Sequence, residues 1–93
     1  MAGSAVRIIV EGRVQGVGFR AFVSDEAWRH NLRGWVRNRR DGSVEALLVG
    51  AREEIDAVIA ACRQGPRLAR VTGLAEEPAS DHGAAGFHER PTV

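Results

Sequence analysis

Apolar and polar residues follow two different spacings in the first third of the chain. Residues 6–12 alternate between apolar side chains, such as Val6 and Val10, and more polar ones, which predicts a strand with one face more buried than the other. Residues 20–31 carry apolar side chains at helical spacing, and Asn31 readily takes the left-handed conformation that ends a helix. The pattern therefore predicts a strand, a loop and a helix, in that order.

The middle of the chain predicts a β-hairpin and a second helix. Two β-rich runs within residues 34–49 are joined by Asp41-Gly42, a dipeptide typical of a tight type I′ turn. Glu53 and Glu54 suit a helix start, and Gly65-Pro66 suits a helix end. Apolar side chains between them recur at i, i+3, i+4 and i+7, namely Ile55, Val58, Ile59 and Cys62.

The last third predicts two more strands. Residues 67–77 have a strand pattern, residues 78–86 are small and polar as in a flexible loop, and residues 87–91 suit a short edge strand that ends at Pro91. The order β-α-β-β-α-β with a tail predicts an α+β, ferredoxin-like sandwich. We expect one domain over residues 1–93, with two helices on one face of an antiparallel sheet and a short extra C-terminal strand.

Composition narrows the class of protein. A chain of 93 residues, 44% of them hydrophobic, can bury roughly 60–65% of its unfolded surface as a globular domain. Its apolar runs are far shorter than the ~20 residues that a membrane span needs, and its first residues lack the pattern of a secretory signal. We therefore expect a soluble, cytoplasmic protein with no membrane partner.

Metal chemistry and broad polyanion binding are not indicated. The single cysteine, Cys62, forms no zinc-like spacing with His30, His82 or His88, so we expect no metal and no cofactor. The formal net charge is only +1, which does not favour a nucleic-acid partner, although all 13 basic residues are arginine.

The loop between the first predicted strand and helix is the strongest candidate site. Its sequence, GRVQGVGFR from Gly12 to Arg20, has three glycines and no acidic residue. Glycines at 16 and 18 allow backbone amides to converge on an anion at a helix start, where the helix dipole is positive. Arg20 in the first turn opposes that dipole at a cost of about 0.3–1 kcal/mol unless an anion is bound. The loop therefore predicts a phosphate cradle.

Other interpretations of these glycines exist. The segment GVGFRA, residues 16–21, matches the dinucleotide-binding fingerprint G-x-G-x-x-A, and Asp41 falls where its ribose-binding acid belongs. That fingerprint requires parallel strands in a much longer domain, and Asp41 is better explained by the hairpin turn. A Walker loop is not indicated, because no G-K-[ST] follows. A glycine-rich turn that binds no ligand remains open from the spacing alone.

Two segments resemble a known family. GRVQGVGFR, followed by GWVRNRRDGSVE at residues 34–45, resembles the signature segments of the acylphosphatases, and the resemblance extends over residues 6–70. It implies a ferredoxin-like fold and an enzyme, a hydrolase that splits the carboxyl–phosphate anhydride of acyl phosphates into carboxylate and inorganic phosphate. It implies no metal, no cofactor and no covalent enzyme intermediate.

The resemblance also implies a set of site residues. Arg20 matches the phosphate-binding arginine of the family, and Asn38 matches the asparagine that orients the attacking water; these are the expected catalytic residues. An asparagine is poorly suited to a strand interior, which agrees with a hydrogen-bonding role for Asn38. The expected phosphate-binding residues are those whose backbone amides form the cradle, together with the arginine: Gln15, Gly16, Val17, Gly18, Phe19 and Arg20.

The sequence departs from the family pattern at two places. Ala21 replaces a common aromatic residue and RHNL stands at 29–32, so we expect these changes to affect substrate fit.

Two functions other than hydrolysis are less well supported by the sequence. The chain lacks the aromatic motif that RNA binding by the sheet would require. Binding of a phosphorylated metabolite without hydrolysis also remains an alternative. We expect a monomer that takes a small acyl phosphate, with phosphate or sulfate able to occupy the loop.

Overall fold

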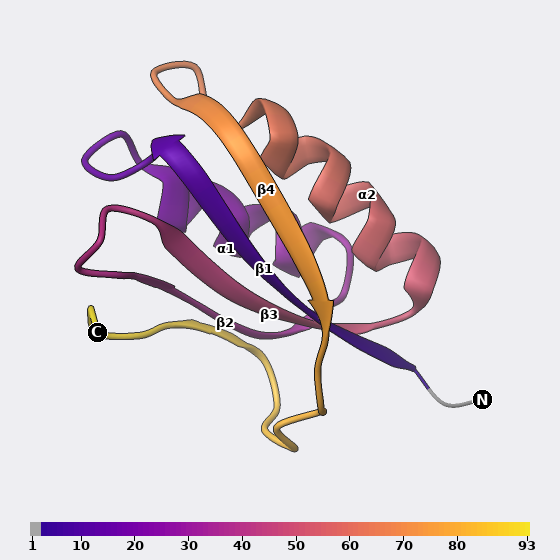
Figure 1. The fold of residues 1–93 in the computed structure, drawn as a ribbon. Coiled ribbons are helices and arrows are strands. Elements are labelled where there is room, and N and C mark those ends of the chain that lie inside the picture. Colours follow the sequence, from indigo (N-terminus) through magenta and orange to yellow (C-terminus); the bar gives the residue numbers. More distant parts are fainter. Residues whose placement is uncertain (1–2) are drawn as a thin grey trace.

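The computed structural model describes residues 3–93 as one mixed sheet with two helices. Along the chain the elements are β1 (Ser4–Arg13), α1 (Phe19–Arg29), β2 (Arg33–Asn38), β3 (Val44–Gly50), α2 (Arg52–Gln64), β4 (Arg70–Pro78) and β5 (Phe87–Glu89). The strands lie in the order β4-β1-β3-β2-β5 (Figure 1). The predicted ferredoxin-like α+β fold is confirmed.

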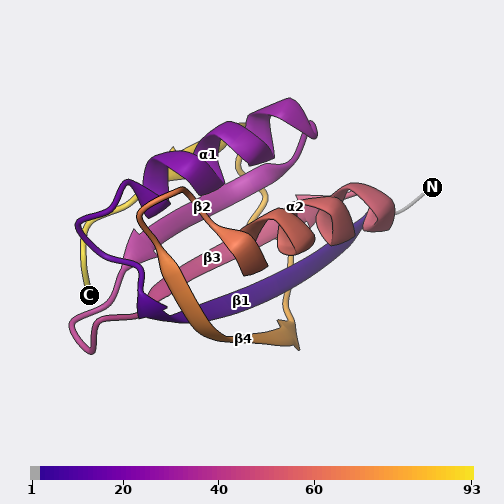
Figure 2. The ribbon, with the colours of Figure 1, turned by 90° about the horizontal axis from the view of Figure 1, so that it is seen from above.

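Both helices cover the same face of the sheet, where they enclose the main core (Figure 2). The alternation in β1 places Val6, Ile8 and Val10 on this face, all three at most 4% exposed. The predicted stripe of α2 packs on them, because Ile55, Val58, Ile59 and Cys62 are all buried. Asn31 has a φ of 61°, so α1 stops at the left-handed residue that the sequence indicates. Within residues 3–93 no helix combines the length and the apolar character needed to cross a membrane.

The expectation of a fully antiparallel sheet is wrong at one edge. β5 pairs with β2 in parallel, with Gly34 opposite Phe87 and Val36 opposite Glu89. β4 ends at Pro78, at the level where β2 begins, because both Pro78 and Leu48 lie opposite Val6. Residues 79–86 then carry the chain from one edge of the sheet to the other, so β5 has to run in the same direction as β2.

The predicted hairpin is confirmed, but its turn is not of type I′. That turn needs positive φ at both central residues, whereas here only Gly42 of the Asp41-Gly42 pair has it, at 95°. Gly42 N donates to Arg39 O at 3.1 Å, and Arg39 N donates to Ser43 O at 2.9 Å. The result is a three-residue loop. Asp41 stabilises it by accepting hydrogen bonds from the Ser43 amide at 2.9 Å and the Ser43 hydroxyl at 2.6 Å.

A chain of ion pairs crosses the sheet face that the helices leave uncovered. Glu45 on β3, only 2% exposed, accepts hydrogen bonds from Arg37 on β2 at 2.8 Å and from Arg7 on β1. Arg7 also pairs with Glu77 on β4. Burial works against ionisation of Glu45, but the two arginines outweigh it and lower the pKa of its carboxyl below the ordinary 4.5. The four neighbouring strands β4, β1, β3 and β2 are thus joined by alternating charges.

Replacing Glu45 with glutamine tests this arrangement. Because the folded-state pKa is lowered, the carboxylate stabilises the fold above pH 4.5, its ordinary value, and this stabilisation is lost as pH falls through the folded value. At pH 7 we expect Glu45→Gln to lower the free energy of unfolding by about 2 kcal/mol, the scale of a hydrogen bond to a charged group. Urea unfolding of the parent chain and the variant at pH 7 and pH 3 measures the difference in their free energies of unfolding. A difference that is equally large at both values would contradict the ionic origin.

Candidate active site

The glycine loop, defined here as residues 14–18, connects β1 to α1 and is fixed at both ends by buried side chains. Val14 and Phe19 are each 1% exposed and belong to the core under the helices. Between them Gly16 and Gly18 have φ values of 72° and 81°, which L side chains rarely adopt. A Cβ at either glycine would meet nothing within 4 Å. The glycines are therefore needed for the backbone conformation, and they leave the outer surface of the loop open.

The backbone amides of this segment lack acceptors. Within the described residues 3–93, no hydrogen bond is donated by the amides of residues 15–21. Those of residues 19–21 are the free donors of a helix start, and the first turn of α1 contains no acidic residue. Consecutive free donors at the positive end of a helix favour a bound anion.

Arg20 projects from the same first turn. Across residues 3–93 it forms neither an ion pair nor a side-chain hydrogen bond, and it is only partly exposed. Arg29 at the other end of α1 is instead paired with Glu26 at 2.9 Å. Of the two arginines in α1, the one that the helix dipole disfavours is thus also the one that has no carboxylate partner among the described residues.

Asn38 lies at the same end and on the same face of the sheet. It is the last residue of β2 and is two residues from Val36, whose side chain is in the core beneath the helices. Its cross-strand partner Val44 belongs to that core as well. β1 and β2 are both antiparallel to β3, so their C-terminal ends coincide, and α1 begins there (Figures 1 and 2). The carboxamide of Asn38 has no hydrogen-bond partner within the described chain and is not buried, which leaves it available to solvent.

Gln15 has contacts that its sequence position does not suggest. Its side-chain Nε2 donates to the backbone oxygens of Arg39, at 2.7 Å, and Ser43, at 2.9 Å. These partners are 24 and 28 residues away in the chain. The sequence indicates only a backbone role for Gln15, because nothing in a one-dimensional pattern shows which carbonyls the hairpin will present to it.

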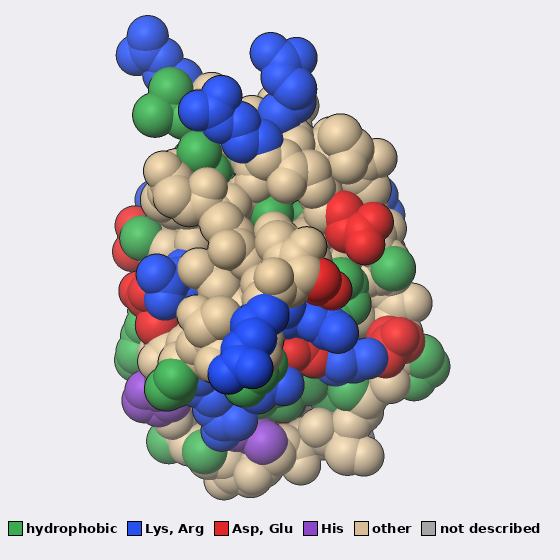
Figure 3. Space-filling view, turned by 60° about the vertical axis from the view of Figure 1, so that its left-hand side comes forward, with side chains coloured by type: hydrophobic (Ala, Val, Ile, Leu, Met, Phe, Trp, Pro, Cys, Tyr) green, Lys and Arg blue, Asp and Glu red, His purple; other side chains and the backbone are tan. Residues whose placement is uncertain are grey.

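The 13 arginines divide into three groups according to their partners. Those with carboxylate partners are Arg7, Arg29, Arg33, Arg37, Arg39, Arg52 and Arg63. Arg90 lies over the ring of Trp35, at 5.1 Å from its centroid. The others have no such partner among the described residues, and all come from segments at the glycine-loop end: Arg13, Arg20, Arg40, Arg67 and Arg70. Viewed toward this end, Figure 3 shows arginines projecting in an upper and a lower group, with acidic side chains mainly to either side.

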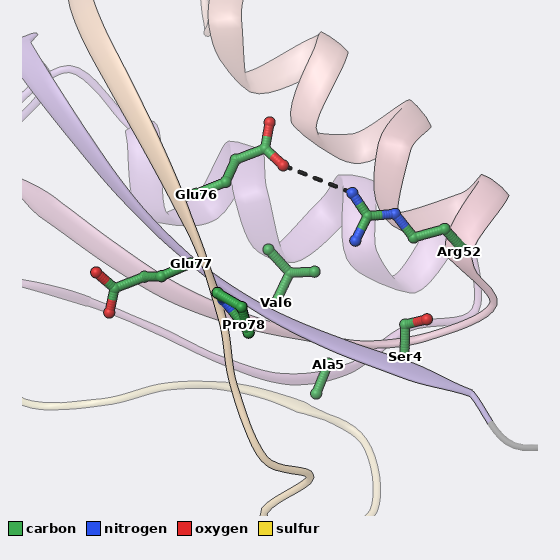
Figure 4. Close-up of a pocket in the computed structure, with 7 residues that line it drawn as sticks. All are labelled: Ser4, Ala5, Val6, Arg52, Glu76, Glu77 and Pro78. Atoms are coloured by element: carbon green, nitrogen blue, oxygen red, sulfur yellow. Dashed lines mark ion pairs between the residues drawn. The ribbon is translucent and has the colours of Figure 1, made fainter.

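Two surface cavities lie away from the glycine loop. A cavity of about 450 Å³ is lined by the start of β1, the end of β4 and Arg52 of α2 (Figure 4). Another, of about 420 Å³, lies next to it around Gly50 and Ala51. Both are at the end of the sheet opposite to the glycine loop, because Ser4 begins β1 and lines each of them. Arg52 and Glu76 already pair across the first at 3.6 Å. Neither of these two cavities includes a residue of the glycine loop.

In the part of the chain that the structure describes, neither the cysteine nor a metal-binding cluster adds to this set of residues. Burial raises the pKa of the Cys62 thiol to about 12, with a smaller contribution from Glu26, so the nucleophilic thiolate is scarce at neutral pH. Among residues 3–93 there is no group of three or more His, Cys, Asp or Glu side chains that could hold a metal ion. The free amides, Arg20 and Asn38 all lie at one end of the sheet.

The chain is an α+β domain with free backbone amides and an arginine that has no carboxylate partner, among the described residues, at one end of the sheet. Comparisons with known proteins show its family. The family model for acylphosphatase matches residues 6–89. An acylphosphatase of Rhodopseudomonas palustris is 60% identical over 74 residues, covering 80% of this chain and 75% of its own. One from Nitrobacter winogradskyi is 50% identical over 93 residues, covering 94% of each chain. The solved acylphosphatase of Coxiella burnetii superposes with a TM-score of 0.91 at 31% identity, covering 96% of this chain and 94% of its own.

The chain belongs to the acylphosphatase family. It is an enzyme, and its activity is the hydrolysis of acyl phosphates. Its substrate is a small molecule.

Proposed function

We propose that the glycine loop and Arg20 hold the phosphoryl group of the acyl phosphate while Asn38 positions the attacking water. The observation that carries this is the run of free backbone amides at residues 15–21 next to an arginine with no carboxylate partner. A phosphoryl group has three peripheral oxygens that need several donors at once. Converging amides and a planar guanidinium supply them with matched geometry.

The reaction needs few protein groups because the substrate is already activated. The water oxygen forms a bond to phosphorus, and the bond between phosphorus and the carboxyl oxygen breaks, so that the carboxylate leaves with the bonding pair. The Asn38 carboxamide oxygen accepts a hydrogen bond from the water and directs its lone pair at phosphorus. The water's protons remain with the phosphate and the solvent. The amides and Arg20 stabilise the charge on the phosphoryl oxygens in the transition state.

The direct test is hydrolysis by the purified chain in the presence of a strong chelator. With a simple acyl phosphate such as acetyl phosphate, we expect equimolar release of carboxylate and phosphate, at the same rate with and without chelator, and competitive inhibition by inorganic phosphate. We propose further that the enzyme acts without metal as a cytoplasmic monomer. Loss of activity with chelator and its recovery with Mg²⁺ would contradict the metal-independent mechanism.

A further inference from the structure

One side chain connects the two halves of the proposed site. Gln15 is part of the glycine loop, and its Nε2 donates to Arg39 O at 2.7 Å and to Ser43 O at 2.9 Å. A primary amide nitrogen has two N–H donors, so both are used. Because both neighbours are carbonyl oxygens, only the nitrogen of the carboxamide can face them. The orientation of the Gln15 side chain is therefore determined by its partners.

The two acceptors are the residues that close the hairpin loop. Arg39 N donates to Ser43 O at 2.9 Å, and this hydrogen bond closes the hairpin loop. Gln15, in the glycine loop, donates to the carbonyl oxygens of the same two residues. Arg39 directly follows Asn38 in the chain. On its other side the hairpin is held by Val93, whose amide donates to Asn38 O at 3.2 Å and whose oxygen accepts from Arg40 N at 2.8 Å. Asn38 thus lies in a strand end that is held from both sides, and among the hydrogen bonds of residues 3–93 only those of Gln15 join this hairpin to the glycine loop.

We infer that Gln15 is a positioning residue: it fixes the distance between the glycine loop and Asn38, and so the line along which water reaches phosphorus. This inference rests on the proposed function. A direct role for its side chain in phosphate binding does not fit, because both N–H donors are occupied and the remaining group is an oxygen acceptor. An acceptor beside phosphoryl oxygens repels them. Its backbone amide can still bind phosphate, so the two roles of Gln15 are separate.

The expected result of Gln15→Met is a selective loss of turnover. Methionine keeps the length of the side chain and removes both donors, so the hairpin loses its fixed position against the loop. Misplacement of a reacting group by about 1 Å can cost about 10²-fold in rate. We expect kcat to fall about 10- to 100-fold. Inhibition by inorganic phosphate should be little changed, because the backbone amides and Arg20 remain. Gln64→Met, at the exposed end of α2, is the matched control and should leave both quantities unchanged.

A double-mutant cycle with Asn38→Ala decides whether Gln15 acts through Asn38. If it does, Gln15→Met causes no further loss of kcat once Asn38 is alanine, because there is no water-orienting group left to position. A merely structural role would lower the melting temperature equally in both backgrounds and would not produce this pattern in kcat. If the methionine variant does not fold, Gln15→Glu keeps the shape, loses both donors at neutral pH and serves in the same cycle.

The possible outcomes separate this inference from the proposed function. Unchanged kcat in Gln15→Met, or a full multiplicative loss in the double variant, would overturn the positioning role while leaving Asn38 and Arg20 as proposed. Full activity of Asn38→Ala alone would overturn the role of Asn38 itself and the inference that depends on it. A parallel loss of phosphate inhibition in Gln15→Met would show that the side chain supports phosphate binding instead, and would also overturn it.

Discussion

Arg20→Lys is expected to lose most of the activity even though the positive charge is retained. A lysine ammonium is a point charge, whereas the guanidinium presents parallel N–H donors that match two phosphoryl oxygens. Because Arg20 acts beside free backbone amides, we expect kcat/KM to fall by about 10²–10³, the scale for one well-placed oxyanion donor. Arg20→Ala should lose at least as much. Initial rates with a simple acyl phosphate, measured below and above KM, provide the comparison.

The same substitutions should not weaken the fold. Arg20 is a cation in the first turn of α1, where the dipole costs about 0.3–1 kcal/mol, and it has no carboxylate partner in residues 3–93 to offset this. We therefore expect Arg20→Ala to unfold at the same urea concentration as the parent chain or slightly above it. Added phosphate should raise the melting temperature of the parent chain and have little effect on the variant, since only the parent binds it tightly.

Arg29→Lys is the matched control, because it makes the same change at the opposite end of the same helix. Arg29 is paired with Glu26 at 2.9 Å and lies in the last turn, where a cation is favoured. Activity and phosphate inhibition should be unchanged. Retention of most activity by Arg20→Lys would show that any cation suffices at this position and would remove the two-pronged clamp from the mechanism.

The fold could be predicted from the sequence because its determinants are local. The alternation in β1 and the helical stripe of α2 are visible without any partner, and Asn31 ends α1 in the conformation that its own side chain tolerates. The direction of β5 could not be predicted in this way. It depends on the path of residues 79–86 from one sheet edge to the other, which no local pattern encodes.

The turn type shows how a small error in the predicted loop length changes which residues of the hairpin face each other. A two-residue turn at positions 41 and 42 would pair Asn38 with Glu45. The observed three-residue loop shifts the register by one, so that Asn38 lies opposite Val44 and Arg37 lies opposite Glu45. This shift places the asparagine on the face covered by the helices and the ion pairs on the other face. The sequence indicates a turn at Gly42, the glycine that makes this loop possible, but the Asp41-Gly42 dipeptide alone does not distinguish the two loop lengths.

For the candidate site, the sequence indicates which residues to consider but not how they are connected. Glycines at 16 and 18 and the unusual position of Arg20 at a helix start are visible in the sequence, and all of them lie at one end of the sheet in the structure. The contacts of Gln15 with Arg39 and Ser43 depend on how the hairpin packs against the loop. A polar side chain in a segment otherwise made of glycine and valine was the one available signal.

Asn38→Ala is the second substitution for which we expect a large effect, and it should lower kcat without weakening phosphate binding. The asparagine lies at the same end and on the same face of the sheet as the start of α1 and forms no hydrogen bond with a described side chain, so we expect it to orient water without taking part in phosphate binding. We expect kcat to fall by about 10²–10³, as for the loss of one well-placed polar group. The inhibition constant of inorganic phosphate should change little, because the backbone amides and Arg20 are intact.

The control for Asn38→Ala removes the only other asparagine of the chain. Asn31→Gly retains the positive φ of 61° without strain and lies at the far end of α1, so its activity should equal that of the parent. Phosphate inhibition separates the two kinds of site residue: Arg20 variants should lose it together with turnover, and Asn38 variants should lose turnover alone. If Asn38→Ala lost both in proportion, the carboxamide would be a phosphate ligand, and the attacking water would need another partner.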